Sequence, residues 1–197
     1  IATPVATLPH ICRQLAPLLS AHTIVSDVGS TKQSALAAFA EHLGVHLPRC
    51  VAAHPIAGSD RHGALAAQFG LYQDKKLIIC PHAQQDAGAL ETVETLWQAV
   101  GAHTYRMSAA THDAIFAAVS HMPHMLAYAY VHQIAEHPDG QTYLDFAASG
   151  FRDFTRIASS HPAIWTDICM ANKDSLLDLL AGQQQALAYL QNLLQSN

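Results

Sequence analysis

The chain has 197 residues, of which half are apolar and 13% are charged, so the composition predicts a globular protein and excludes a disordered one. The formal net charge is −5 and no basic stripe is present, so we expect no nucleic-acid partner. No apolar run reaches the roughly 18 residues that span a bilayer, and we expect no membrane partner either. The four scattered cysteines form no CxxC pair, which favours a cytoplasmic location over a disulfide scaffold.

The first residues, IATPVATLPHICRQ, have neither the basic flank nor the small-residue cleavage site of a signal peptide. They begin on an apolar, strand-like tripeptide with no cap before it. We therefore expect Ile1 to lie inside a domain whose first part precedes it.

Short apolar runs alternate with helical patterns over the first half of the chain. Strands are expected in HTIVSDVG (22–29), RCVAAHPI (49–56), KKLIICPH (75–82) and HTYRMS (103–108). Helices are expected in STKQSALAAFAEHLG (30–44) and AQQDAGALETVETLWQAVGA (83–102). This alternation predicts a largely parallel sheet with helices on its faces.

From Ser108 onward the pattern is helical. The segment 108–137 predicts one long helix, capped by Ser108 or Thr111, and Pro123 inside it predicts a kink because proline removes a backbone donor. Further helices are expected in SGFRDFTRIASSHPAIWTDICMANKDSLLDLL and AGQQQALAYLQNLLQ. We therefore expect an α/β region over residues 1–107, followed by an all-α region over residues 108–197.

The motif SDVGSTK, residues 26–32, ends an expected strand and leads into a helix. It places backbone N–H groups and the Ser30 hydroxyl at the C-terminal edge of the sheet, where open α/β sheets bind ligands. An ordinary helix cap at Ser30 or Thr31 would give the same pattern, so the motif alone does not decide.

The motif AHPIAGSD, residues 53–60, follows the next expected strand, so His54 should lie at the same edge as Ser30. A histidine there is a plausible general base because its ordinary pKa lies near neutrality, and a serine hydroxyl can orient its ring. The alternative is a loop histidine shaped by a turn.

Two histidines, His121 and His124, lie three residues apart on one helical face. As zinc ligands they would need a third ligand, and the pair His112–Asp113 upstream raises the possibility of an HD-type metal-dependent phosphohydrolase. No clear matching set of histidines and aspartates is present on other helices. The alternative is a core histidine bonded to a carbonyl that the proline leaves free.

The segment SGFRDFTRIASSHPAIW brings two arginines within one helical turn of each other. Arg152 and Arg156 are spaced to present two guanidinium groups to carboxylates. A surface ion pair between Asp153 and a neighbouring arginine explains the same spacing, and spacing alone favours it.

Taken together and in order, SDVGSTK, HPIAGSDRHG, HDAIFAAVSHMPHMLAYA and GFRDFTRIASSHPAIWTDICMANK closely resemble the prephenate/arogenate dehydrogenase family of tyrosine biosynthesis. The resemblance extends from about Ile1 to beyond Lys173. It implies a partial Rossmann-like dinucleotide-binding segment over residues 1–107 and a C-terminal helical domain over 108–197 that binds substrate and forms a homodimer. It also implies oxidative decarboxylation of prephenate to 4-hydroxyphenylpyruvate, with hydride transfer to NAD or NADP.

The resemblance also implies roles for individual residues. His54 matches the catalytic histidine that accepts the substrate's hydroxyl proton, and Ser30 matches the serine that bonds this histidine beside the nicotinamide. His124 matches a substrate-binding histidine, and Arg156 matches the arginine that binds a substrate carboxylate. His121 is then structural, and neither histidine of the pair needs a metal.

We predict further contacts around these four residues. Substrate contacts are expected for Arg152, Trp165 and Asp60. Cofactor contacts are expected for Ser30, Pro4 and Gly29. Asp60 stands where relatives often carry glutamate at the mouth of the pocket. The shorter side chain weakens the case for a gating role.

Other functions stay open on the sequence alone. The glycine-rich GxGxxG turn, and the residue that selects NAD or NADP, are absent and would lie upstream of Ile1.

Arogenate is the nearest alternative substrate, and a carboxylate such as Asp60 or Asp74 would favour binding of its ammonium group. An HD-type hydrolase, or a non-catalytic fragment that dimerises and binds ligand, are the alternatives from other classes.

Overall fold

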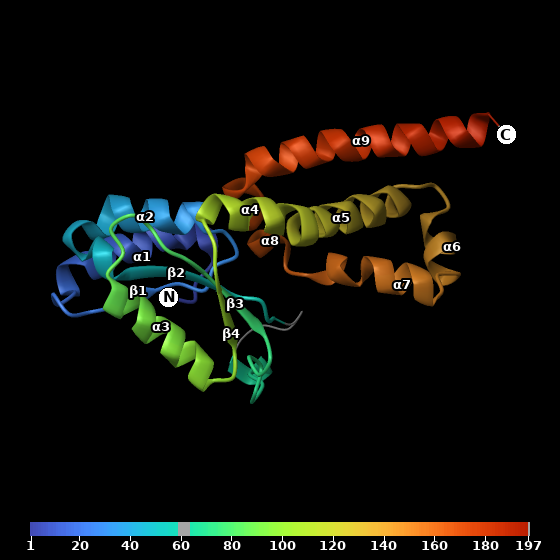
Figure 1. Cartoon of the computed structure of the whole chain (residues 1–197). Helices are drawn as coiled ribbons and strands as arrows, with labels where there is room; N and C mark the ends of the chain where they lie inside the picture. The colour runs from blue at the N-terminus through green and yellow to red at the C-terminus, as the bar shows by residue number, and fades with distance from the viewer. Residues whose placement is uncertain (59–63, 197) are drawn as a thin grey trace.

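The computed structural model describes residues 1–58 and 64–196, which form a half that contains the sheet and a helical half beside it (Figure 1). The first half contains strands β1 (Val25–Ser26), β2 (Cys50–Pro55), β3 (Lys76–Cys80) and β4 (His103–Arg106), and helices α1 (Leu8–Leu15), α2 (Gln33–Leu43) and α3 (Ala87–Ala99). The second half contains helices α4 (Ala109–Phe116), α5 (Met122–Ala135), α6 (Gly140–Asp145), α7 (Ser149–Thr155), α8 (Pro162–Ala171) and α9 (Lys173–Gln195). The predicted order of an α/β region followed by an all-α region is confirmed.

The sheet has the strand order β1-β2-β3-β4 within the described residues. Strand β1 pairs with β2 and β3 pairs with β4 in parallel, but β2 and β3 are antiparallel. The expectation of a largely parallel sheet therefore fails at its centre. No α-helix is assigned between β2 and β3 within the described residues, and a parallel pair needs a long crossover connection, usually a helix.

Alternate residues of the central strands face opposite sides of the sheet. Cys50 and Ala52 of β2 belong to the core under α1 and α2, whereas Val51 and Ala53 belong to the core under α3. Figure 1 shows α1 and α2 covering one face and α3 the other. Burial on both faces explains why the sequence of β2 is a nearly continuous apolar run. The strand places His54 at its C-terminal end, at the edge of the sheet.

The N-terminal segment differs from the expectation. Residues 1–4 are assigned no strand, although the N–H of Val28 donates to the carbonyl of Ile1, so the segment runs beside β1. Helix α1 follows, which the sequence analysis did not predict. Its fully or nearly buried residues Leu8 and Cys12 are four apart, and this spacing was the available signal for a helix.

The expected long helix after Ser108 is interrupted. The Ser108 hydroxyl accepts the N–H of Thr111 at 3.0 Å, which confirms the predicted cap. Between α4 and α5, residues Ala117–His121 form a π-helical turn, in which the N–H of Met122 donates to the carbonyl of Ala117 five residues earlier. Pro123 directly follows this wide turn, so the proline is accommodated by a change of helical register.

Helix α9 lies along the outer side of the helical half and ends far from the sheet (Figure 1). Its first turns pack Leu176 against Ala117 of the π-helical turn and Met122 of α5. Farther along, large apolar residues are exposed. Within the described residues, no helix is long and apolar enough to cross a membrane.

Candidate active site

A cavity of about 830 Å³ lies between the two halves of the molecule. Residues of the β1–α2 loop and the end of β2 line one side, and residues of α4, α5, α8 and the segments around them line the other. Five of the predicted site residues line this cavity: Ser30, His54, His124, Arg156 and Trp165. Residues separated by more than a hundred positions in sequence thus face one space.

His54 is the fifth residue of β2 and reaches the cavity at the C-terminal end of that strand. Its Nδ1 lies 2.9 Å from Nε2 of His112, and its ring packs edge-on against Phe116. Burial, together with the neighbouring His112, lowers the pKa of His54 to about 3. The ring is therefore neutral at physiological pH, which is the form that accepts a proton.

Ser30 lines the same cavity but makes no hydrogen bond within the described residues. The expected bond from Ser30 to His54 is not present among the described residues, and the ring of His54 is bonded through Nδ1 to His112. Neither Ser30 nor Thr31 caps helix α2 with its side chain, and the first turn finds its acceptor on another helix.

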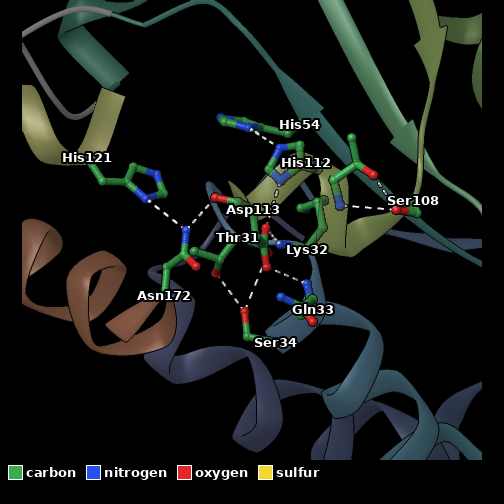
Figure 2. A network of polar contacts seen from close by, with 12 residues as sticks. Thr31, Lys32, Gln33, Ser34, His54, Ser108, His112, Asp113, His121 and Asn172 are labelled. Atoms are coloured by element: carbon green, nitrogen blue, oxygen red, sulfur yellow. Dashed lines mark hydrogen bonds and ion pairs between the residues drawn. The ribbon is translucent and has the colours of Figure 1, made fainter. Parts of the chain in front are cut away.

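That acceptor is Asp113 of α4. One of its carboxylate oxygens accepts the N–H of Lys32 at 2.7 Å and the other accepts the N–H of Gln33 at 2.9 Å (Figure 2). Burial would raise the pKa of Asp113, but hydrogen bonds from His112 and from these two N–H groups hold the pKa below its ordinary value. A charged carboxylate of the helical half thus caps a helix of the sheet-containing half.

The loop between β1 and α2 is held by a buried ion pair. The ammonium group of Lys32 donates to Asp27 and, at 2.6 Å, to the carbonyl of Ala53, the residue before His54. Burial lowers the pKa of Lys32, while the neighbouring Asp27 acts to raise it. The SDVGSTK motif predicts a strand end that leads into a helix, but nothing in its sequence indicates that its lysine and aspartate form an ion pair inside the protein.

On the helical side, His124 stacks on Trp165 with ring centroids 3.4 Å apart and an interplanar angle of 18°. Its Nδ1 donates to the carbonyl of Ser120 at 3.0 Å, which leaves Nε2 as the acceptor of the neutral ring. Burial lowers the pKa of His124, so this neutral form predominates. This carbonyl is not the one that Pro123 leaves free, which is that of Val119, so the expected bond to a freed carbonyl is not found among the described residues; His124 lines the cavity instead.

The two arginines of the segment after α6 are separated by the fold. Arg156 begins the 3-10 turn Arg156–Ser159 and lines the cavity. Arg152 lies one turn earlier on α7, is exposed, and donates to the carbonyl of Ala147. It is not among the residues that line the cavity, so the structure gives no support to its predicted substrate contact.

The other predicted residues lie apart from the cavity or outside the described residues. Gly29 lies in the β1–α2 loop, where its N–H donates to Asp27 at 2.8 Å, and an added Cβ would lie 3.0 Å from the same carboxylate. Pro4 is exposed and precedes the short turn Val5–Thr7. Asp60 falls in the segment that the structure does not describe.

The metal-dependent alternative finds no support in the geometry. No group of three or more potential metal ligands occurs within the described residues. The pair His112 and Asp113 is bonded to each other, to His54 and to α2, and His121 accepts a hydrogen bond from Asn172 at 3.3 Å. Asn172 also donates to the backbone carbonyl of Asp113, so it joins the start of α9 to α4 (Figure 2).

Two family models match the chain end to end. Residues 1–106 match the nucleotide-binding domain of prephenate dehydrogenase, and residues 108–197 match its dimerization domain. The chain belongs to the prephenate dehydrogenase family.

Relatives within this family are similar over most of the chain. The prephenate dehydrogenase of Bacillus subtilis is 39% identical over 90% of this chain and 48% of its own length. A crystal structure of the Aquifex aeolicus prephenate dehydrogenase in complex with hydroxyphenyl propionate and NAD⁺ is 34% identical, has a TM-score of 0.90, and matches 98% of this chain and 67% of its own. The structure of Synechocystis arogenate dehydrogenase has a TM-score of 0.82 and 27% identity, over 99% of this chain and 70% of its own. The chain thus spans about half of the Bacillus relative.

Proposed function

We propose that the protein to which this chain belongs catalyses the oxidative decarboxylation of prephenate to 4-hydroxyphenylpyruvate, with hydride transfer to NAD or NADP. The observation that carries this proposal is one cavity lined by Ser30 and His54 from one half and by His124 and Arg156 from the other. The family resemblance assigns roles to these same four residues, and the geometry is compatible with each of those roles.

In the proposed reaction His54 accepts the proton of the substrate's ring hydroxyl. The ring is neutral and so has a lone pair for that proton; its pKa of about 3 applies to the cavity without substrate, and the negative charges of a bound dianion would raise it. As the hydroxyl carbon becomes a carbonyl carbon, loss of carbon dioxide makes the ring aromatic. Decarboxylation sends its electron pair into the ring and leaves a phenolate oxygen, so the proton held on His54 returns to that oxygen and no net proton is released.

Arg156 and His124 are proposed to bind the substrate's carboxylate side. Prephenate is a dianion, and the guanidinium of Arg156, which is exposed and lines the cavity, can bind a carboxylate through two parallel N–H donors. His124 is fixed by its hydrogen bond to Ser120 and by the stack on Trp165, so its other ring nitrogen is held in one direction. Both groups lie across the cavity from His54.

The residues present fit the edge of a nicotinamide site. The hydroxyl of Ser30 faces the cavity without an internal partner in the described residues, and Gly29 keeps the loop after β1 close to Asp27. This loop, at the C-terminal edge of the sheet, would hold the nicotinamide end of the cofactor. Bound NAD or NADP supplies the hydride acceptor.

Prephenate is preferred here over arogenate as the substrate. Arogenate carries an ammonium group, and the described residues that line the cavity include no acidic side chain. Asp74, one of two suggested carboxylates, lies instead on an open surface hollow with Gln73 and His103. The other, Asp60, falls outside the described residues.

Calorimetric titration of the chain with prephenate and with arogenate tests the proposal. Arg156→Ala should weaken prephenate binding about tenfold to a hundredfold, as expected for a charged hydrogen bond. Arg152→Ala is the matched control, because it removes the same charge one turn away without touching the cavity. Failure of both substrates to bind, with NAD and NADP present, or equal losses in both variants, would contradict the proposal.

We also propose that the chain forms a homodimer through α9. Leu187, Leu190 and Leu194 lie on one face of this helix and are between half and four-fifths exposed. Exposed apolar stripes of this kind mark protein interfaces, and the family model that matches this half is described as a dimerization domain. An isologous interface would pair the helix with its own copy.

A further inference from the structure

Three side chains from two elements form a single file that ends at the cavity. The Asp113 carboxylate lies 2.7 Å from Nδ1 of His112, and Nε2 of His112 lies 2.9 Å from Nδ1 of His54 (Figure 2). Asp113 and His112 are both fully buried, whereas His54 lines the cavity. The order from the interior outward is therefore carboxylate, imidazole, imidazole.

The hydrogen atoms in this file can be assigned from the carboxylate outward. Asp113 is ionised and accepts two backbone N–H groups, from Lys32 and Gln33, so it can only accept from His112 as well. The Nδ1 of His112 must therefore carry a proton. If His112 is neutral, its Nε2 has a lone pair and can only accept, so Nδ1 of His54 must donate.

The neutral form of His112 is the one compatible with a base at His54. An imidazolium at His112 would donate to Nδ1 of His54 and force the proton of neutral His54 onto Nε2, where it would block proton acceptance. It would also place a second positive charge beside His54 once that ring had accepted a proton, in a region without water to screen the repulsion. Each reason selects the same arrangement.

We propose that His112 and Asp113 are positioning residues that hold His54 with its proton on Nδ1 and its lone pair on Nε2, directed to the cavity. The neutral state of His112, and with it the tautomer of His54, rests on the proposed role of His54 as the base. When His54 takes a proton, the Nδ1–H group donates to His112, and the charge of Asp113 stabilises the imidazolium through that ring.

The same carboxylate links the base to the rest of the site. By accepting the N–H groups at the start of α2, Asp113 fixes the helix that begins directly after the Ser30 loop. One side chain from the helical half therefore orients the ring of His54 and anchors the loop beside it. Both elements of the sheet-containing side of the cavity depend on α4.

Nitrogen NMR of the histidine-labelled chain at neutral pH reads the tautomer directly, and His54→Gln identifies the relevant signals. We expect Nδ1 of His54 to be protonated and Nε2 to carry the lone pair. In Asp113→Asn a neutral amide replaces the carboxylate that fixes the proton of His112 on Nδ1, so the Nε2–H tautomer of His54 should gain population. The ratio of the two tautomers should change by roughly tenfold or more.

Two further variants keep the test decisive if Asp113→Asn does not fold. His112→Gln offers both a donor and an acceptor to His54, so the two tautomers should become mixed. His121→Gln changes a buried histidine of the π-helical turn after α4, which has no hydrogen bond to His112 or His54 among the described residues, and it should leave the tautomer of His54 unchanged.

A proton on Nε2 of His54 in the unaltered chain, or a doubly protonated His112 at neutral pH, would overturn the inference. An unchanged tautomer in both Asp113→Asn and His112→Gln would do the same. The expected tautomer in a chain that binds neither prephenate nor arogenate would instead refute the proposed function and leave this inference standing.

Discussion

Helices α4 and α9 break the usual rule of burial in opposite ways. Helix α4 buries a histidine and an aspartate, His112 and Asp113, completely, and their side chains bond each other, His54 at the cavity and the first turn of α2. Helix α9 exposes large apolar residues such as Leu190 and Leu194. Buried polar groups need partners inside the molecule, whereas exposed apolar groups need a partner outside it. The first helix is therefore built for the site and the second for an interface.

Replacing the buried carboxylate should have the largest effect. Asp113→Ala leaves the N–H groups of Lys32 and Gln33 and the ring of His112 without their acceptor, so we expect the free energy of unfolding to fall by about 3–5 kcal/mol. Urea unfolding followed by circular dichroism measures the change. Ser108→Ala, which removes only the exposed cap of α4, should cost about 1 kcal/mol. Equal losses of unfolding free energy in Asp113→Ala and Ser108→Ala would contradict the special importance of the buried carboxylate.

A charge on α9 should affect assembly and leave the fold intact. Leu190→Asp places a carboxylate on the exposed stripe, and the dimer should dissociate about a hundredfold more readily because the charge would be desolvated in the interface. Light scattering across a concentration series measures the mass. The matched control is Leu96→Asp on α3, where a comparably exposed leucine lies in the other half. A native chain that stays monomeric at all concentrations would contradict the assignment of α9.

The buried histidines should make stability depend on pH. Burial lowers the pKa of His121 to about 4, so as the pH falls below about 6.5 the unfolded chain binds a proton before the folded chain does. Stability is therefore lost as the pH falls from about 6.5 toward 4, by up to about 1.4 kcal/mol per pH unit for each such group. His121→Gln should reduce this slope, and the exposed His132→Gln should not. Denaturant titrations at several pH values measure it.

The smallest effect is expected at an ion pair on the surface. Arg106 of β4 donates to Glu94 of α3 through two nitrogens, yet the arginine side chain is 54% exposed. Solvent screens such pairs, so Arg106→Ala should change the free energy of unfolding by less than about 1 kcal/mol. Thermal unfolding measures the change in stability. A loss greater than about 1 kcal/mol would show that exposed polar contacts stabilise this fold as much as buried ones do.

Local patterns were sufficient to predict most elements of the fold. Alternation of apolar runs and helical segments located the four strands and helices α2 and α3, and Ser108 marked the start of α4. The antiparallel pairing of β2 and β3 depends on how the chain returns through the segment between them, which periodicity does not report. Helix α1 and the interruption at Ala117–His121 were not predicted for different reasons: the first has a helical pattern over only eight residues, and the second is a change of register within one continuous pattern.

The site was predicted less completely than the fold. Sequence order and resemblance pointed to His54, His124 and Arg156, which line one cavity. The partner of His54 was not found, because His112 is 58 positions away and contact over that separation is set by packing between the two halves. The adjacent pair His112–Asp113 on an apolar helix was the available signal, and it was considered only as a metal motif.

The π-helical turn before Pro123 sets the direction in which the side chains of α5 point. Phe116 and His124 both line the cavity, yet they are eight positions apart, which on an uninterrupted α-helix would place them about 80° apart around the axis. The π-helical turn absorbs one position, so the effective spacing is close to two full revolutions and both side chains point the same way. Deleting a single residue between Ala117 and His121 would leave the two side chains seven positions apart on a regular helix and still on one face, whereas straightening the turn without a deletion would rotate His124 by about 100°, away from the space that His54 faces.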